Sequence, residues 1–275
     1  MANELISKLY INSIIERKQK LFQNTLEPYG RKVYSQTDED GILEEIIFRM
    51  NKNQTDLTFV EIGVGSGTEN NTLKLLAEGA KGVWIEGDSQ KAKSCLALTH
   101  KFVEEKRLLI LNAMADINNL KEICSKVVEQ LGTNVIDVFS IDVDGPDYEL
   151  TELMLSENLL LPEIIVCEYN GRFGPSIIAN DDYTNNVSKS KLPPHLFYGT
   201  GSSLNRWVNL LRNYKLVACG ILGINAFFVR ADKHDSYKFP NTNIREIYNP
   251  LELRPWIEGG FKQLHGFPSH FSTYN

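Results

Sequence analysis

The stretch that decides the fold is residues 59–68, which read Phe-Val-Glu-Ile-Gly-Val-Gly-Ser-Gly-Thr. An apolar strand carrying one acid ends here in three glycines at alternate positions. Glycines at the carboxyl end of a strand let the backbone turn sharply and come close to a ligand. A dinucleotide-binding turn would have its third glycine at position 68, where this chain has Thr68. The motif therefore predicts a strand–turn–helix ligand site that does not favour a dinucleotide.

Apolar strands alternate with helical patterns around this motif. The expected strands are Thr58–Ile62, Gly82–Glu86, Leu108–Leu111, Val135–Ile141 and Glu163–Cys167. Near-continuous apolar strands separated by helices indicate a parallel sheet that is covered on both faces. Lys215–Gly220 and Asn225–Arg230, which are joined by a short connection, have the pattern of a closing hairpin. We predict a doubly wound, Rossmann-like α/β fold with a seven-stranded sheet whose last strand is antiparallel.

The rest of the chain divides into three parts. Residues 1–50 form an N-terminal helical extension packed on the core, with apolar positions at helical spacing. Residues 51–231 form the ligand-binding domain. Within it, the polar segment 171–200 reads as a lid or substrate loop, because loops of that length in compact domains are usually functional. Residues 232–275 form a tail with weak periodicity.

Composition narrows the functional class. The 275 residues are 42% hydrophobic and 23% charged, which suits one globular enzyme domain with additions. The net charge of −6 disfavours a general nucleic-acid binder, which normally has a basic face. No segment has the apolar run of a signal peptide or a membrane span, so we expect a cytoplasmic protein. The four cysteines form no Cys-x-x-Cys pair and are expected to be buried, reduced thiols: Cys95, Cys124, Cys167 and Cys219.

The acid before the glycines indicates the cofactor. Glu61, two residues before Gly63, suits the cationic amino group of S-adenosylmethionine and would repel a pyrophosphate. Glu86 ends the second strand, where a carboxylate can accept hydrogen bonds from both ribose hydroxyls. The third strand ends at Asn112, beside the expected adenine position. The sequence therefore predicts S-adenosylmethionine as cofactor, bound by Glu61, Gly63, Gly65, Glu86, Gly87, Asn112 and Ala113, on the sheet typical of class I methyltransferases.

Polar side chains also follow the fourth and fifth strands. Asp142 and Asp144 end the fourth strand, and Glu168 and Asn170 end the fifth. These four should converge beyond the carboxyl ends of the strands. Oxygen ligands suit Mg²⁺ or Mn²⁺, which could lower the pKa of a substrate hydroxyl. Two alternatives stay open: a carboxylate acts as general base, or Asp142 binds the cofactor while Asp144 only forms a turn.

Two residues late in the lid are further catalytic candidates. His195 and Tyr198 could orient or deprotonate an acceptor hydroxyl. Histidine has the favourable pKa for this task, but a lone histidine in a loop is more often a surface residue. Asp144, Glu168, His195 and Tyr198 are therefore the catalytic set that we expect.

In the order of its motifs, the chain resembles the FkbM-type family of S-adenosylmethionine-dependent methyltransferases over roughly residues 33–231. The motifs are Tyr34–Gln36, Glu39–Ile42, Val60–Gly63, Ile85–Glu86, Ser140–Gly145 with Asp147–Tyr148, Glu168–Asn170, Tyr198–Gly199 with Ser202–Leu204, and Asn225–Arg230. The resemblance implies O-methylation, often of sugars in bacterial surface polysaccharides or of secondary metabolites, and adds Gln36 to the expected cofactor contacts. Thr37–Asp38 and the segment 171–200 depart from the family pattern.

The expected acceptor is a hydroxyl of a sugar, a sugar nucleotide or a small phosphorylated intermediate. N-methylation is an alternative, but Glu168–Gly171 stands where amine methylases have Asn/Asp-Pro-Pro-Tyr, which favours oxygen. A non-catalytic cofactor-binding subunit is a second alternative, and the intact Glu61, Glu86 and acid cluster argue against it. A homo-oligomer is possible, and no nucleic-acid partner is expected.

Overall fold

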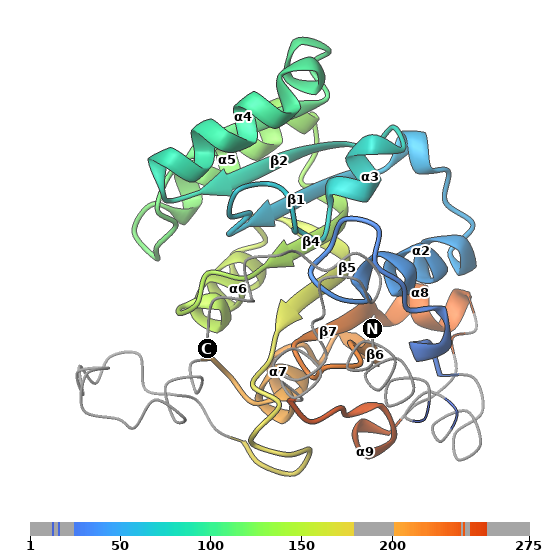
Figure 1. Cartoon of the computed structure of the whole chain (residues 1–275). Coiled ribbons are helices and arrows are strands. Elements are labelled where there is room, and N and C mark those ends of the chain that lie inside the picture. The colour runs from blue at the N-terminus through green and yellow to red at the C-terminus, as the bar shows by residue number, and fades with distance from the viewer. Residues whose placement is uncertain are drawn as a thin grey trace, which may run out of the picture.

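The computed structural model describes Ser13, Glu16 and residues 25–178, 201–237, 239 and 243–251 (Figure 1). Its strands form one seven-stranded sheet in the order β3-β2-β1-β4-β5-β7-β6. The strands are β1 (Thr58–Ile62), β2 (Lys81–Glu86), β3 (Leu108–Asn112), β4 (Val135–Ile141), β5 (Leu161–Glu168), β6 (Tyr214–Cys219) and β7 (Asn225–Arg230). β1 to β5 are parallel, and β7 runs antiparallel to β5 and β6. This confirms the predicted sheet.

Ten helical segments accompany the sheet in the part of the chain that the structure describes. They are η1 (Glu27–Tyr29), α2 (Glu39–Arg49), η2 (Gln54–Asp56), α3 (Leu73–Ala77), α4 (Ser89–Glu104), α5 (Leu120–Leu131), α6 (Asp147–Ser156), α7 (Leu204–Leu210), α8 (Ala231–Ser236) and α9 (Ile244–Ile247). α2 lies within the N-terminal extension, residues 1–50, that the sequence predicts to be helical. Across the described ranges, no helix has both the length and the apolar character needed to cross a bilayer.

Helices cover both faces of the sheet, as Figure 1 shows. One core lies under α5, α6, α7 and α9, and α5 contributes Leu120, Ile123, Cys124 and Val127 at helical spacing. The other core lies under α2, α3 and α4, with Trp84 of β2 fully buried in it. All four cysteines are free and buried, which confirms their predicted structural role.

The order of the strands positions the site. β1 pairs with β2 on one side and with β4 on the other, so the chain leaves the centre of the sheet in both directions. In open α/β sheets, ligands bind in the crevice outside the carboxyl ends of the strands at this switch point. The glycine turn after β1 and the acids at the ends of β4 and β5 therefore lie together, beyond the carboxyl ends of these strands.

The loop before α2 is organised by three buried acids. Asp40 Oδ2 accepts hydrogen bonds from three consecutive backbone N–H groups, those of residues 33–35. Glu39 Oε1 accepts the side-chain amide of Asn225 at 2.9 Å, and Asp38 accepts the backbone N–H of Ile221 at 3.0 Å. Residues 31–41 are thereby attached to the turn and strand of the β6–β7 hairpin.

Asp38 generates a pH-dependent prediction. Burial, followed by the charge of Glu39, raises the pKa of Asp38 to about 7. Between roughly pH 4 and 7, Asp38 is protonated in the folded chain and ionised in the unfolded chain. The free energy of unfolding of the wild type is therefore highest at low pH and falls as the pH rises to about 7. We expect the free energy of unfolding of Asp38→Asn, relative to wild type, to rise by at least about 1 kcal/mol from pH 5 to pH 8.

Urea unfolding at pH 5, 6.5 and 8 measures this change, with Asp56→Asn as an exposed control. A constant difference between Asp38→Asn and wild type over this range would contradict it.

Candidate functional site

The turn after β1 can be made only with glycine at its first position. Gly63 has a φ of +88°, and a Cβ there would lie 1.7 Å from the backbone oxygen of Asp142. Gly65 has a φ of +59°, and a Cβ there would meet no atom within 4 Å. The first glycine therefore lets the β1 turn press against the β4 loop, and the second faces open space where a ligand can approach the backbone.

Two adjacent cavities meet at this turn. We call them the first cavity, of about 290 Å³, and the second cavity, of about 470 Å³. Gly63, Gly65, Lys91 and Asp142 line both of them. The first extends toward Gln36 and the loop after Gly65, and the second toward the ends of β2 and β3. The site is thus a cleft in two parts joined at the glycine turn.

Glu86 forms part of the second cavity, where the sequence placed it. Its Oε2 accepts the backbone N–H of Gly65 at 2.7 Å, and its Oε1 accepts that of Asp88 at 2.7 Å. Each carboxylate oxygen has a second lone pair, so the group can still accept two hydroxyl donors. The buried Glu86 therefore fixes the glycine turn and keeps the acceptor capacity that a ribose needs.

The end of β3 differs in part from expectation. Ala113 lines the second cavity, together with Met114, which sequence reasoning did not single out. Asn112 is absent from the lining of both cavities, and its side-chain nitrogen donates to the backbone oxygen of Glu86 at 2.8 Å. A Cβ on Gly87 would lie 2.8 Å from Met114 Cε, so this glycine makes room for the methionine at the rim.

Glu61 lines the first cavity, but its carboxylate is already well supplied with donors. The donors are the Asn70 side chain at 2.9 Å, the Asn71 N–H at 2.8 Å, the Thr72 N–H at 3.0 Å and hydroxyl at 2.6 Å, and the Ser140 hydroxyl at 3.4 Å. Burial raises the pKa of Glu61, while these hydrogen bonds lower it. The structure therefore gives Glu61 a role in holding the loop before α3, beside the ligand contact that the sequence suggested.

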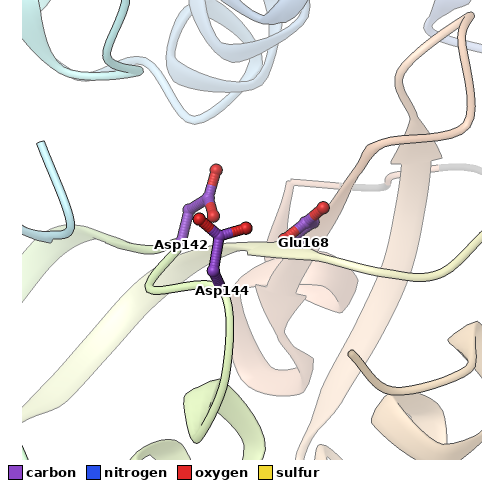
Figure 2. A group of neighbouring side chains, drawn as sticks. All are labelled: Asp142, Asp144 and Glu168. Atoms are coloured by element: carbon purple, nitrogen blue, oxygen red, sulfur yellow. The ribbon is translucent and has the colours of Figure 1, made fainter. Parts of the chain in front are cut away.

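Three carboxylates gather at the ends of β4 and β5 (Figure 2). Ligand oxygens of Asp142, Asp144 and Glu168 all lie within 4.8 Å of one another. Desolvation in the cleft and the neighbouring acids raise the pKa of Asp142 to about 7 and that of Glu168 well above its usual value. These shifts reflect the negative charge that three neighbouring carboxyl groups concentrate at one place.

The loop that carries two of these acids is held in an uncommon conformation. Asp144 has a φ of +54°, in the left-handed region that few residues other than glycine adopt. Asp147 holds the loop by accepting the N–H groups of Val143 at 2.8 Å and Gly145 at 3.0 Å. Strained residues persist only where the surroundings fix them, and they cluster at functional sites.

The remaining expected residues fall in different places. Gln36 lines the first cavity. The side-chain oxygen of Asn170 accepts the N–H of Arg172 at 3.0 Å, so it is engaged within its own turn. His195 and Tyr198 lie outside the described residues. Asn70 and Asn225, which line the first cavity, were not predicted as site residues, although Asn225 begins a motif of the family resemblance.

No protein-family model and no curated protein matches the chain. Among solved structures, an O-methyltransferase from Bacillus cereus in complex with S-adenosylhomocysteine is 16% identical, with a TM-score of 0.44, over 80% of this chain and 90% of that one. A methyltransferase from Geobacter sulfurreducens is 13% identical, with a TM-score of 0.41, over 67% and 75%. An O-methyltransferase family protein from Burkholderia thailandensis is 12% identical, with a TM-score of 0.40, over 68% and 55%. At these values the similarity does not decide the reaction.

The contacts of Glu61 generate a stability prediction. Replacing it with alanine leaves the donors of residues 70–72 without their acceptor inside the protein. We expect Glu61→Ala to lower the free energy of unfolding by about 2–4 kcal/mol, measured by urea titration without ligand. Thr68→Ala, which removes an exposed hydroxyl contact with Ser66 in the same loop, should cost less than about 1 kcal/mol. Equal unfolding midpoints for Glu61→Ala and wild type would show that the hydrogen bonds contribute nothing.

Proposed function

We propose that this chain is an S-adenosylmethionine-dependent methyltransferase that acts on an oxygen of a small-molecule acceptor. The observation that carries the proposal is the arrangement of the cleft. Glu86 stands at one end, the open glycine turn lies between the two cavities, and three clustered carboxylates stand beside the junction. A ligand with a nucleoside at one end and an amino acid at the other suits this two-part shape.

The residues present fit that cofactor on chemical grounds. In the second cavity, Glu86 would accept the two ribose hydroxyls, while Ala113 and Met114 would cover the adenine. Gly65 leaves space for the sulfonium chain between the cavities. Glu61, Glu69 and Asp142 line the first cavity, where Lys91 is the only basic residue in the lining that the structure describes. This balance of charge suits a cationic ligand and opposes a pyrophosphate.

The acid cluster fits a hard divalent cation. Its donors are all carboxylate oxygens, the ligands that Mg²⁺ and Mn²⁺ prefer. Within the described residues no basic side chain forms an ion pair with any of the three acids, whose mutual repulsion helps to raise two of their pKa values. When bound there, such an ion would lower the pKa of an acceptor hydroxyl. Asp142, Asp144 and Glu168 would hold it.

The same acids support a second version of the chemistry. Desolvation and the neighbouring acids raise the pKa of Asp142 to about 7, close to the value that suits a general base at neutral pH. An ionised carboxylate of this cluster could instead accept the proton of the acceptor hydroxyl as general base. In either version the transfer is an in-line displacement, so the chain must mainly align the nucleophilic oxygen with the methyl group and exclude water.

The cluster also bears on the acceptor. Clustered carboxylates stabilise an ammonium ion, which has no lone pair to attack, so they oppose amine methylation and favour a hydroxyl. An acceptor with adjacent hydroxyls, as on a sugar or sugar nucleotide, could present two oxygens to a bound cation. We therefore propose a sugar-type hydroxyl as acceptor, and a phosphorylated one only where the cation neutralises the acids.

The cofactor assignment predicts an effect of Glu86→Ala. Calorimetry should show that S-adenosylhomocysteine binds wild type with micromolar affinity, that NAD does not bind, and that Glu86→Ala binds at least roughly tenfold more weakly. The reason is the loss of charge-assisted hydrogen bonds to the ribose. Glu104→Ala, at the exposed end of α4, is the control. An unchanged affinity in Glu86→Ala, or tight binding of NAD, would argue against the cofactor.

The chemical assignment predicts separate effects on turnover and binding. Asp144→Ala and Glu168→Ala should each abolish methyl transfer to an acceptor and leave the affinity for S-adenosylhomocysteine nearly unchanged, because these groups act on charge that develops at the nucleophile. Glu152→Ala, exposed on α6, is the control.

A chelator then separates the two versions. A cation-dependent enzyme loses activity and recovers it with Mg²⁺ or Mn²⁺, whereas a carboxylate-base enzyme is unaffected. Near-normal turnover in both alanine variants would overturn the role of the cluster.

A further inference from the structure

Two residues that line the first cavity each carry a buried amide oxygen without a hydrogen-bond partner. Asn70 is 6% exposed and Asn225 is 3% exposed, and both residues line this cavity. Asn70 Oδ1 and Asn225 Oδ1 have no hydrogen-bond partner among the described residues. Buried polar atoms in proteins are almost always paired, because an unpaired one costs about 1–3 kcal/mol. Because both residues line one cavity, a ligand in that cavity could supply the missing donors.

The orientation of both amides is fixed by their neighbours. The nitrogen of Asn70 donates to Glu61 Oε2 at 2.9 Å, and the nitrogen of Asn225 donates to Glu39 Oε1 at 2.9 Å. Both carboxylates also accept backbone N–H groups, those of residues 71 and 72 for Glu61 and that of Thr37 for Glu39, so each acts as an acceptor and the amide nitrogen faces it. The carbonyl oxygen of each asparagine is therefore the atom left for a ligand.

The charge of the cavity narrows the ligand. Three acids, Glu61, Glu69 and Asp142, line it, and Lys91 is the only basic residue among its described lining residues. Glu61 already accepts five hydrogen bonds from the protein, so it supplies negative charge but little further acceptor capacity. A cationic group with several N–H donors would use the two amide oxygens as acceptors and the acids as counter-charge.

We propose that Asn70 and Asn225 are the residues that recognise the α-ammonium group of the cofactor's amino-acid end. This inference rests on the proposed function, because it takes the two cavities as one site for an adenosyl amino acid. It assigns the contact with the ammonium to two amides in place of the Glu61 carboxylate. One of these amides, that of Asn225, lies on β7, whereas the strands that carry the cofactor motifs are β1 to β4.

The assignment of Asn225 links the N-terminal extension to cofactor binding. Asn225 is held by Glu39, and Glu39 also accepts the N–H and hydroxyl of Thr37 at 2.6 Å each. Gln36, next to Thr37, lines the same cavity. Glu39 is thus a positioning residue for both the amide and the loop that closes this end of the cleft.

The test is a cycle of two variants against two ligands. The ligands are S-adenosylhomocysteine and its deamino analogue, which lacks only the α-amino group, and calorimetry measures the affinity of each. Asn225→Ala and Asn70→Ala should each bind S-adenosylhomocysteine roughly tenfold more weakly than wild type, the factor expected for a hydrogen bond to a charged group. Both should bind the deamino analogue within about twofold of wild type, because the partner of the amide is then missing. Asn209→Ala, which removes an exposed amide on α7, should change neither affinity.

The pattern separates recognition from a structural role. If the asparagines only support the loops, or only bind water, each variant loses the same factor for both ligands, and the inference is overturned. If S-adenosylhomocysteine binds wild type and the variants bind it equally well, the inference fails while the proposed function stands. If S-adenosylhomocysteine does not bind wild type, the proposed function fails, and the inference fails with it. Unfolding curves without ligand identify a variant that has lost its fold. Asn70→Gln and Asn225→Gln, which keep an amide donor for the acid and an acceptor oxygen, should then retain the preference for the amino ligand.

Discussion

A carboxylate buried at the carboxyl end of an inner strand needs hydrogen-bond donors. The donors that Glu61 recruits fix the loop that forms one wall of the site. Glu61 lies in β1, and its donors come from the loop before α3 and from Ser140 of the neighbouring β4. An ionised group removed from water without such partners would cost several kcal/mol. The loop therefore has to wrap around the acid, and its path sets the wall of the first cavity.

Other carboxylates hold loops around the cleft in the same way, by accepting backbone N–H groups. Asp40 accepts three consecutive N–H groups before α2, Asp147 accepts two in the loop after β4, and Glu86 holds both Gly65 and Asp88. Each of these acids fixes the backbone by accepting N–H groups. Asp142, Asp144 and Glu168 differ, because they face one another instead of a set of donors. That difference separates acids that hold the loops of the site from the three acids that we propose act on a ligand.

Much of this arrangement could be predicted from residues close in the sequence. The apolar strands, the glycine turn and the acids at strand ends depend on local pattern and on the rule that parallel strands end at one edge. The roles of Asn112 and Asn225 could not, because an amide can face a ligand or a neighbour with equal ease. Asn112 turns to the backbone of β2, and the partner of Asn225 is Glu39, 186 positions away in the chain. Such pairings are decided only when distant segments pack.

The N-terminal extension shows the consequence of this distant pairing. By sequence, residues 1–50 look like an addition to a complete binding domain, yet Gln36 lines the first cavity and Lys32 connects that loop to Glu69 after β1 at 3.2 Å. Asp38 and Glu39 attach the same loop to Ile221 and Asn225 at the opposite edge of the site. A domain trimmed to residues 51–231 would contain all seven strands but lose one wall of the first cavity and the apolar face of α2 that completes one of the two cores. The extension and the β6–β7 hairpin therefore act together as the second half of the binding site.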